Sequence, residues 1–395
     1  MKIKRLAALI TCIVILITVL AGCNNEEHDY EQYDENDYDL ADEANLEDEN
    51  DDTATPNIQD QFVSIDFEAS FNTFAPDTVM IRGGNITVTW AELYVYLFNA
   101  VNELLSGFDM GGDWSDLLFE DMTLGDVTLG HAMEEALQLL IFAHGAYLSD
   151  VSLSADDENM LSQELESLIE MYGSRDELAA VLRAFGGFYS IELFESMIRS
   201  QHLVEVLMDA LFGIGAEAFP DEYVTIYSQR EGYMMAKHIL RVKTEDDNET
   251  PRIELENILQ QLHEYDGEDI QSFFESLVNQ YSEDPGIQFY PYGYLFQFPD
   301  MVVPFSQASA GLQIGEFSDI VETDFGFHII LRVPFNYDVV PVGIETAGQL
   351  YTLRQLAASE RLVSLLEEWR DSLEIEFTPE FESIYMADIF EIIRS

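Results

Sequence analysis

Apolar residues recur every three to four positions through the middle of this 395-residue chain. That spacing places apolar side chains on one face of a helix, which can then pack against a core. It predicts helices over residues 133–148, 155–171, 175–185 and 191–212. Ser154 with Asp157, and Ser174 with Glu177, have the spacing of helix N-caps. We therefore expect a helical region between Thr128 and about Arg230.

A short β-hairpin is expected before these helices. Thr78–Arg82 and Ile86–Val88 flank the turn residues Gly83, Gly84 and Asn85. Thr89 and Glu92 then have the spacing of a capping box, in which each side chain satisfies the other's backbone N–H. They predict a helix over residues 90–105, so folded structure should start near Phe62.

The second half of the chain contains β-branched runs typical of strands. Met235–Val242 is one such run, and Asp319–Glu322 and the stretch beginning near His328 flank a tight turn through Asp324–Gly326. A last helix is predicted over residues 346–373. Its apolar stripe comprises Leu350, Leu353, Leu356, Leu362, Leu365, Leu366, Trp369 and Leu373. A single helix cannot bury such a stripe alone, so we expect it to return and pack against the earlier helices. The fold class predicted is α+β.

The N-terminus has the pattern of a secretory signal. Lys2, Lys4 and Arg5 precede the apolar run Leu6–Val19, which is too short for a stable membrane span. The run ends in Leu-Ala-Gly-Cys at Cys23, which resembles the lipobox of bacterial lipoproteins. The resemblance implies cleavage before Cys23 and lipidation of that residue. An ordinary signal peptide or an uncleaved anchor is the alternative.

Charge narrows the function classes further. The formal net charge of −59 argues against nucleic-acid binding, because phosphate would be repelled. Of residues 26–52, 15 of 27 are Asp or Glu and none is Lys or Arg, so this stretch cannot bury enough apolar surface to fold. We interpret it as an extended tether, in preference to a calcium-binding segment, because it contains no D-x-D-x-D-G loop. With two cysteines the chain offers neither a disulfide framework nor a cysteine-based zinc site.

Five short motifs follow one another between residues 233 and 335. They are Lys-His-Ile-Leu at 237–240, Ser-Glu-Asp at 282–284, Met-Val-Val-Pro-Phe at 301–305, Gly-Glu-Phe-Ser at 315–318 and Thr-Asp-Phe-Gly-Phe-His-Ile-Ile at 323–330. In order and spacing they resemble a parvulin-type peptidyl-prolyl isomerase domain, built of an antiparallel sheet plus helices. The chain departs from the family at Pro291–Phe296, where parvulins usually carry a glycine-rich turn.

The resemblance implies the residues of the active site. His238, Asp284, Thr323 and His328 match the catalytic positions, and Met301 and Phe305 match the proline pocket. Tyr294 or Leu295 is expected to line the wall where the glycine-rich turn is missing. No cofactor is implied. A zinc site made of the two histidines and Asp284 is conceivable, but no H-E-x-x-H or similar spacing supports it.

The layout of hairpin, helices and parvulin-like segment resembles PrsA- and SurA-type foldases. It implies a signal peptide at 1–22, a lipid-anchored acidic linker at 23–60, a helical domain at 61–232, the isomerase domain at 233–335 and a returning helix at 336–395. The implied partners are unfolded or partly folded secreted polypeptides with X-Pro bonds, outside the membrane of a Gram-positive bacterium, with a homodimer left open. The function implied is that of a prolyl isomerase and foldase. A holdase with an inactive parvulin domain and a non-catalytic adhesin or ligand-binding lipoprotein are the alternatives.

Overall fold

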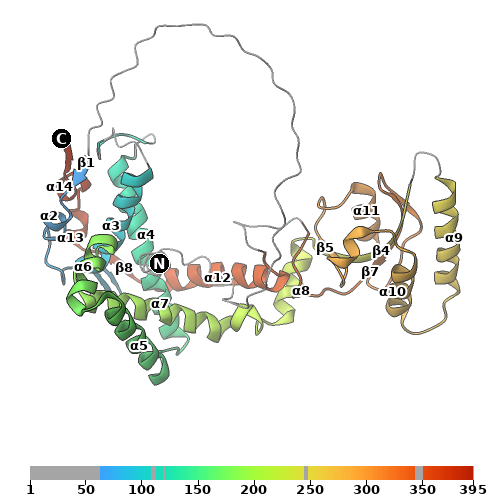
Figure 1. Cartoon of the computed structure of the whole chain (residues 1–395), viewed down its shortest axis with the longest axis horizontal. Helices are drawn as coiled ribbons and strands as arrows, with labels where there is room; N and C mark the ends of the chain where they lie inside the picture. Colours follow the sequence, from blue (N-terminus) through green and yellow to red (C-terminus); the bar gives the residue numbers. More distant parts are fainter. Residues whose placement is uncertain (1–62, 108–112, 119–120, 244–247, 343–349, 395) are drawn as a thin grey trace, which may run out of the picture.

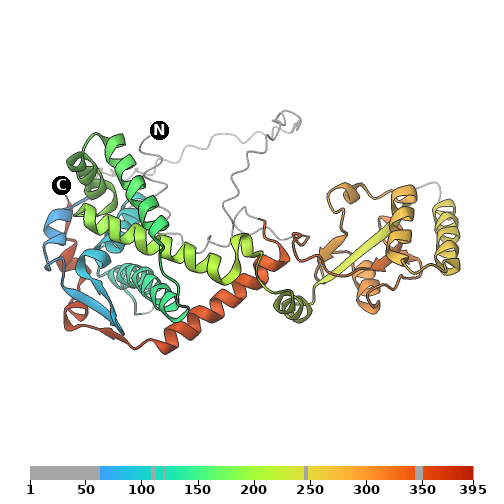
Figure 2. The same cartoon turned by 90° about the horizontal axis from the view of Figure 1, so that it is seen from below.

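The computed structural model describes residues 63–107, 113–118, 121–243, 248–342 and 350–394. Two bodies lie at opposite ends of a long molecule (Figure 1). The larger is mainly helical, and the smaller contains a four-stranded sheet. The chain leaves the larger body after α8 (Asp221–Arg230) and returns through α12 (Leu353–Ser372), which runs back along the larger body (Figure 2). Cys23, the expected signal peptide and the acidic linker lie outside the described residues.

Segments distant in sequence meet in the small sheets of the larger body. The predicted hairpin is confirmed as β2 (Val79–Gly83) and β3 (Ile86–Thr89), with Gly84 at a φ of +58° in the turn. From the C-terminal region, β8 (Ile375–Phe377) pairs antiparallel with β2. Similarly, β1 (Val63–Ile65) pairs with β9 (Ile392–Arg394). The two ends of the described chain are therefore part of one body.

The helices of the larger body follow the predicted pattern closely. They are α2 (Phe67–Phe71), α3 (Trp90–Gly107), α4 (Leu124–Leu148), α5 (Ala155–Tyr172), α6 (Arg175–Gly186) and α7 (Ile191–Phe212), followed by η2 (Ile214–Ala216), with α13 (Pro379–Glu382) and α14 (Met386–Ile389) near the end of the chain. The predicted caps at Ser154 and Ser174 are present, as is the Thr89–Glu92 pair. The start expected at residue 133 for α4 is wrong, because Thr123 and Asp126 form a capping box that begins the helix at Leu124.

The last long helix starts later than predicted. Thr352 and Gln355 form a capping box, so α12 begins at Leu353 rather than at residue 346, and residues 343–349 lie outside the described part. Leu350 precedes the helix and is 65% exposed, so its assignment to the apolar stripe is wrong. The helix packs on α4 and α8. At the contact with α4, a Cβ added to Gly145 would lie 2.5 Å from the Trp369 ring.

The smaller body is built on an antiparallel sheet with the strand order β5-β4-β7-β6. The strands are β4 (Met234–Val242), β5 (Tyr294–Phe296), β6 (Val321–Glu322) and β7 (Gly326–Arg332). One face packs on α9 (Glu249–Glu264) and α10 (Ile270–Tyr281), and the opposite face packs on α11 (Val303–Gly311). Because side chains alternate along a strand, each strand contributes to both cores. The predicted α+β class is confirmed.

A buried arginine sits where the two bodies join. The guanidinium of Arg354, near the start of α12, donates to the carbonyl of Phe219 at 2.6 Å and to the carboxylates of Asp221 and Asp338 at 2.7 Å each. Phe219 lies just before α8, Asp221 is the first residue of α8, and Asp338 belongs to the connector that leads back from the sheet. Arg354 thus ties the outgoing and returning chains together. No helix among the described residues has the length and apolarity needed to cross a membrane.

Candidate active site

Pairing of the two central strands brings the two predicted histidines together. Leu240 of β4 lies opposite His328 of β7, and His238 lies opposite Ile330, so the histidines are diagonal neighbours on one face. Their ring centroids are 5.1 Å apart with the planes nearly perpendicular. Both are buried, with 6% and 4% of their surface exposed.

Asp284 approaches His238 from the loop after α10. Ser282 and Glu283 hold this loop on the edge of β4: Leu240 N–H donates to the Ser282 hydroxyl, and the Leu240 carbonyl accepts from Glu283 N–H. Asp284 then caps η3 (Pro285–Gln288), its Oδ1 accepting from Gly286 N–H at 3.0 Å. Its Oδ2 lies 3.1 Å from His238 Nε2. Within the described residues neither ring nitrogen of His238 makes a hydrogen bond of good geometry, so Oδ2 and Nε2 are close neighbours without an aligned hydrogen bond.

Thr323 holds the second histidine. Its hydroxyl oxygen lies 2.8 Å from His328 Nε2 and accepts from Phe325 N–H at 3.2 Å. The turn between them requires Gly326, which has a φ of +153° and whose added Cβ would lie 2.2 Å from the Arg241 carbonyl oxygen. The Thr-Asp-Phe-Gly turn therefore positions the threonine hydroxyl next to the imidazole of His328.

The charge states of the site follow from burial and partners. Burial by itself raises the pKa of Asp284, but the His238 imidazole, the Tyr294 hydroxyl and Gly286 N–H outweigh it and lower the pKa to about 2. Burial, reinforced by the neighbouring His238, lowers the pKa of His328 to about 3. At neutral pH the site thus contains an ionised carboxylate beside a neutral His328.

Aromatic side chains form the apolar wall of the site. Phe305, on α11, is 1% exposed, and its ring is edge-on to His238 at 5.2 Å and to His328 at 5.7 Å. Met301 is partly buried in the same core, just before α11. Phe296 of β5 lies 5.7 Å from Phe305 and was not predicted, although alternation along a strand through Tyr294 would place it on the same face.

Tyr294 or Leu295 was expected to line the remaining wall, and the pleat of β5 points these two side chains to opposite faces of the sheet. Tyr294 faces the site: its ring stacks on His238 at 5.3 Å and its hydroxyl donates to Asp284 Oδ2 at 2.6 Å. Leu295 faces the other way, into the core beneath α9 and α10. The structure therefore brings Tyr294 into the site with the other predicted residues and does not bring Leu295 there.

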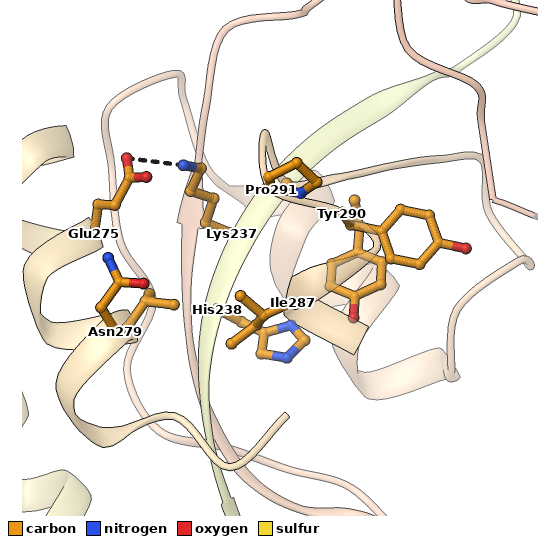
Figure 3. A pocket seen from close by; sticks show the side chains of 10 residues that line it. Lys237, His238, Glu275, Asn279, Ile287, Tyr290 and Pro291 are labelled. Carbon is orange, nitrogen blue, oxygen red and sulfur yellow. Dashed lines mark ion pairs between the residues drawn. The ribbon is translucent and has the colours of Figure 1, made fainter. Parts of the chain in front are cut away.

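A small pocket of about 120 Å³ adjoins this site (Figure 3). His238 and Tyr294 line it together with residues of α10 and of the segment after η3. Tyr290, which also lines the pocket, packs against Tyr294 at 4.5 Å and was not predicted from the sequence. Within the described residues, no three His, Cys, Asp or Glu side chains come together as a metal site would require.

Comparison with known proteins identifies the segment that contains this site. Residues 238–333 match the family model of the rotamase, or PPIC-type PPIase, domain. The chain is 31% identical to a foldase protein PrsA from Geobacillus over 185 residues, which is 45% of this chain and 58% of that protein. It is 28% identical to a PrsA from Oceanobacillus iheyensis over 235 residues, 59% of this chain and 68% of that protein. The chain thus spans only part of the length of these relatives.

Solved structures give a weaker likeness. The crystal structure of PrsA from Bacillus subtilis is 18% identical, covers 75% of this chain and 92% of its own, and has a TM-score of 0.24. PrsA from Bacillus cereus is 15% identical, covers 80% and 99%, and has a TM-score of 0.28. Scores this low establish no common arrangement of the whole chain. The chain carries a parvulin-type domain and is similar to PrsA foldases in sequence.

Proposed function

We propose that this protein is a peptidyl-prolyl cis-trans isomerase and foldase that acts on extracytoplasmic polypeptides. The observation that carries the proposal is the ionised Asp284 next to His238, at the end of an apolar wall that includes Phe305. The match of residues 238–333 to the PPIC-type PPIase domain supports the same activity.

The chemistry needs little from the protein. Rotation about a peptide bond has a barrier of about 18–20 kcal/mol because the amide is conjugated. An acceleration of about a thousandfold requires lowering it by only about 4 kcal/mol. A site that binds the proline ring and favours the twisted, unconjugated amide is therefore sufficient, without a nucleophile or a cofactor.

Each group of the site has a role in such a mechanism. Met301, Phe305 and Tyr294 bind the proline ring by apolar contact. Asp284 faces the substrate carbonyl, and its negative charge disfavours the negative charge that conjugation places on the carbonyl oxygen. The C–N bond thereby loses double-bond character. His238, His328 and Thr323 position Asp284 and maintain the local geometry.

The experiment that tests this function is prolyl isomerisation of a short peptide by the whole protein, with Asp284→Ala as the variant. We expect the variant to be less stable, because the Tyr294 hydroxyl and Gly286 N–H lose their acceptor, but to be folded at the assay temperature and to lose most of its kcat/KM. A folded Asp284→Ala variant with full activity would remove Asp284 from the mechanism, and an inactive wild-type protein would exclude the isomerase.

A holdase without catalysis is the second candidate, and one observation favours it. Tyr294 stands where parvulins usually have a glycine-rich turn, and its hydroxyl occupies one oxygen of Asp284, whose side chain is only 11% exposed. The two functions separate in one comparison: a holdase suppresses aggregation of an unfolded protein while leaving the isomerisation rate of its prolyl bonds unchanged.

The proposal includes the placement of the protein. The lipobox pattern at Cys23 supports a lipid anchor on the outer face of the cytoplasmic membrane, and the sequence likeness to PrsA proteins supports unfolded extracytoplasmic clients. In this proposal residues 233–335 form the isomerase domain, inserted between a helical domain at 61–232 and the returning segment 336–395. The acidic residues 23–60 separate this assembly from the membrane.

A further inference from the structure

The pocket beside the candidate site lies at a break in the edge of the central strand. β5 pairs only with residues 234–236 of β4, and the loop at Ser282 and Glu283 covers the strand again at Leu240. Between them, on the side of β4 away from β7, Lys237 and His238 have no neighbouring strand in the described part of the chain. Gly293 permits this close turn, because it has a φ of +109° and an added Cβ would lie 2.9 Å from the Ala236 carbonyl oxygen.

The pocket is sized for one side chain. Its volume of about 120 Å³ is several times the roughly 30 Å³ that a water molecule occupies in the liquid, and well below the roughly 300–1,000 Å³ of pockets for whole small molecules. Because His238 and Tyr294 line both the pocket and the prolyl site, a side chain bound here would belong to a residue near the proline of the same peptide.

The walls of the pocket are apolar on one side and polar on the other (Figure 3). Val278, Ile287, Tyr290 and Pro291 supply apolar surface. At the other end, Glu275 and Asn279 of α10 lie near Lys237, and Lys237 Nζ is 2.9 Å from Glu275 Oε2. The pocket therefore suits a long side chain with an apolar stem and a charged end.

The unequal exposure of Lys237 and Glu275 indicates which charge on an incoming side chain the pocket favours. The Lys237 side chain is only 10% exposed, whereas that of Glu275 is 46% exposed. The carboxylate is therefore the member of the ion pair that is more open to an entering side chain. Lys237 is the only ion-pair partner of Glu275 in the part of the chain that the structure describes, which leaves its second oxygen available.

We propose that this pocket binds the side chain of a lysine or arginine adjacent to the proline of the client. The stem lies against Ile287 and Pro291, and the cation binds Glu275, with the Asn279 amide oxygen beside it. The net charge of −59 attracts cationic peptides to the protein as a whole. The inference rests on the proposed isomerase function, which it deepens by naming a class of client sequence.

The test compares peptides that differ only in the charge of one side chain. Short peptides carry lysine or norleucine either directly before or directly after the proline, and kcat/KM and Kd are measured with the whole protein. We expect lysine to be favoured over norleucine by about threefold to fivefold at one of the two positions, the range of a partly exposed ion pair. Equal values at both positions would overturn the proposal.

Two variants with opposite expected effects test whether the preference for lysine comes from Glu275 or from the overall charge of the protein. Glu275→Gln removes the carboxylate and should abolish the preference for lysine. Lys237→Met keeps the apolar stem but frees both oxygens of Glu275, so the preference should increase. Glu268→Gln, an exposed residue of the same body with no charged partner in the described part, is the matched control and should retain the wild-type preference. Loss of the preference in the control, or its persistence in Glu275→Gln, would show that the pocket is not its source.

The measurement separates this inference from the function on which it rests. Turnover of the norleucine peptides tests isomerase activity regardless of the pocket. If the wild-type protein proves inactive, the ratio of the two Kd values still decides whether Glu275 selects cationic peptides. Equal Kd values for lysine and norleucine peptides in an inactive protein would overturn both proposals.

Discussion

Tyr294 donates its hydroxyl hydrogen to Oδ2 of Asp284 over 2.6 Å, while its ring stacks on His238. Burial and the carboxylate beside it raise the pKa of Tyr294, so the phenol is protonated and acts as a donor at neutral pH. Tyr294 is thereby part of the polar network and supports the negative charge on Asp284.

Tyr294→Phe tests this role by removing one oxygen and keeping the ring. The pKa of Asp284 should rise from about 2 towards its ordinary value or above, because burial then has fewer opposing contacts. Loss of a hydrogen bond to a charged group should also reduce the free energy of unfolding by roughly 1.5–3 kcal/mol at neutral pH. An NMR titration of Asp284 measures the pKa directly. An unchanged pKa would show that His238 and Gly286 hold the carboxylate on their own.

The lowered pKa of His328 predicts how the stability of the folded protein depends on pH. Its pKa in the folded protein, about 3, lies below that of an unfolded histidine, so the unfolded chain binds more protons between these values. The contribution of His328 to the free energy of unfolding is therefore fully present above about pH 6.5 and is lost as the pH falls towards 3. Asp284, whose pKa is also lowered, adds a loss of the same sign at pH values below about 4.

His328→Gln should make that decline shallower. Between pH 6.5 and pH 5 the variant should lose roughly 1.5 kcal/mol less than the wild-type protein, since one group no longer takes up a proton on unfolding. Urea unfolding at the two pH values provides the measurement. Identical pH dependence in the two proteins would mean that His328 is not held neutral in the folded state.

Gly326→Ala should disturb the turn that positions Thr323. The added Cβ would approach the Arg241 carbonyl oxygen to 2.2 Å at a backbone angle unsuited to alanine, so we expect a loss of roughly 1–3 kcal/mol. Gly311→Ala, at the end of α11, is the matched control, because its Cβ would meet no heavy atom within 4 Å. Thermal unfolding compares the two. Equal stability would show that the turn relaxes at no cost.

Phe305→Ala and Leu295→Ala separate the site from the core. Both residues are 1% exposed, but Phe305 contacts the histidines and Leu295 packs on the opposite face of the sheet. Both variants should lose about 2–5 kcal/mol of stability. Only Phe305→Ala should raise the KM for a prolyl peptide, measured at a temperature where both variants are folded. A similar rise in Leu295→Ala would point to a general loss of packing.

Cys23→Ala tests the anchor implied by the N-terminal pattern. Without the thiol the chain cannot be lipidated, so it should accumulate unprocessed or be released from the membrane. Cell fractionation together with the mass of the N-terminal peptide distinguishes these results. A variant that is cleaved before residue 23 and remains on the membrane would rule out the lipoprotein assignment.

Local patterns in the sequence were sufficient to predict most elements, and the resemblance of its motifs to the parvulin family selected most residues of the candidate site, although Phe296 and Tyr290 were missed and Leu295 lies outside it. The spacing of apolar residues and caps such as Ser154 act within a few residues, so they specify helices without knowledge of the fold. The order of motifs was enough to select His238, Asp284, Thr323, His328, Met301 and Phe305, and the structure brings all six into one region.

Only the tertiary structure decided what depends on pairing and packing between distant segments. The pleat of β5 placed Tyr294 in the site and Leu295 in the opposite core, because a shift of one residue along a strand reverses the face. The ion pair of Lys237 with Glu275 joins a strand to a helix across nearly forty residues, which no local pattern records. The addition of β8 to β2 likewise depends on burying apolar surface from both ends of the chain at once, a global condition that no single segment can express.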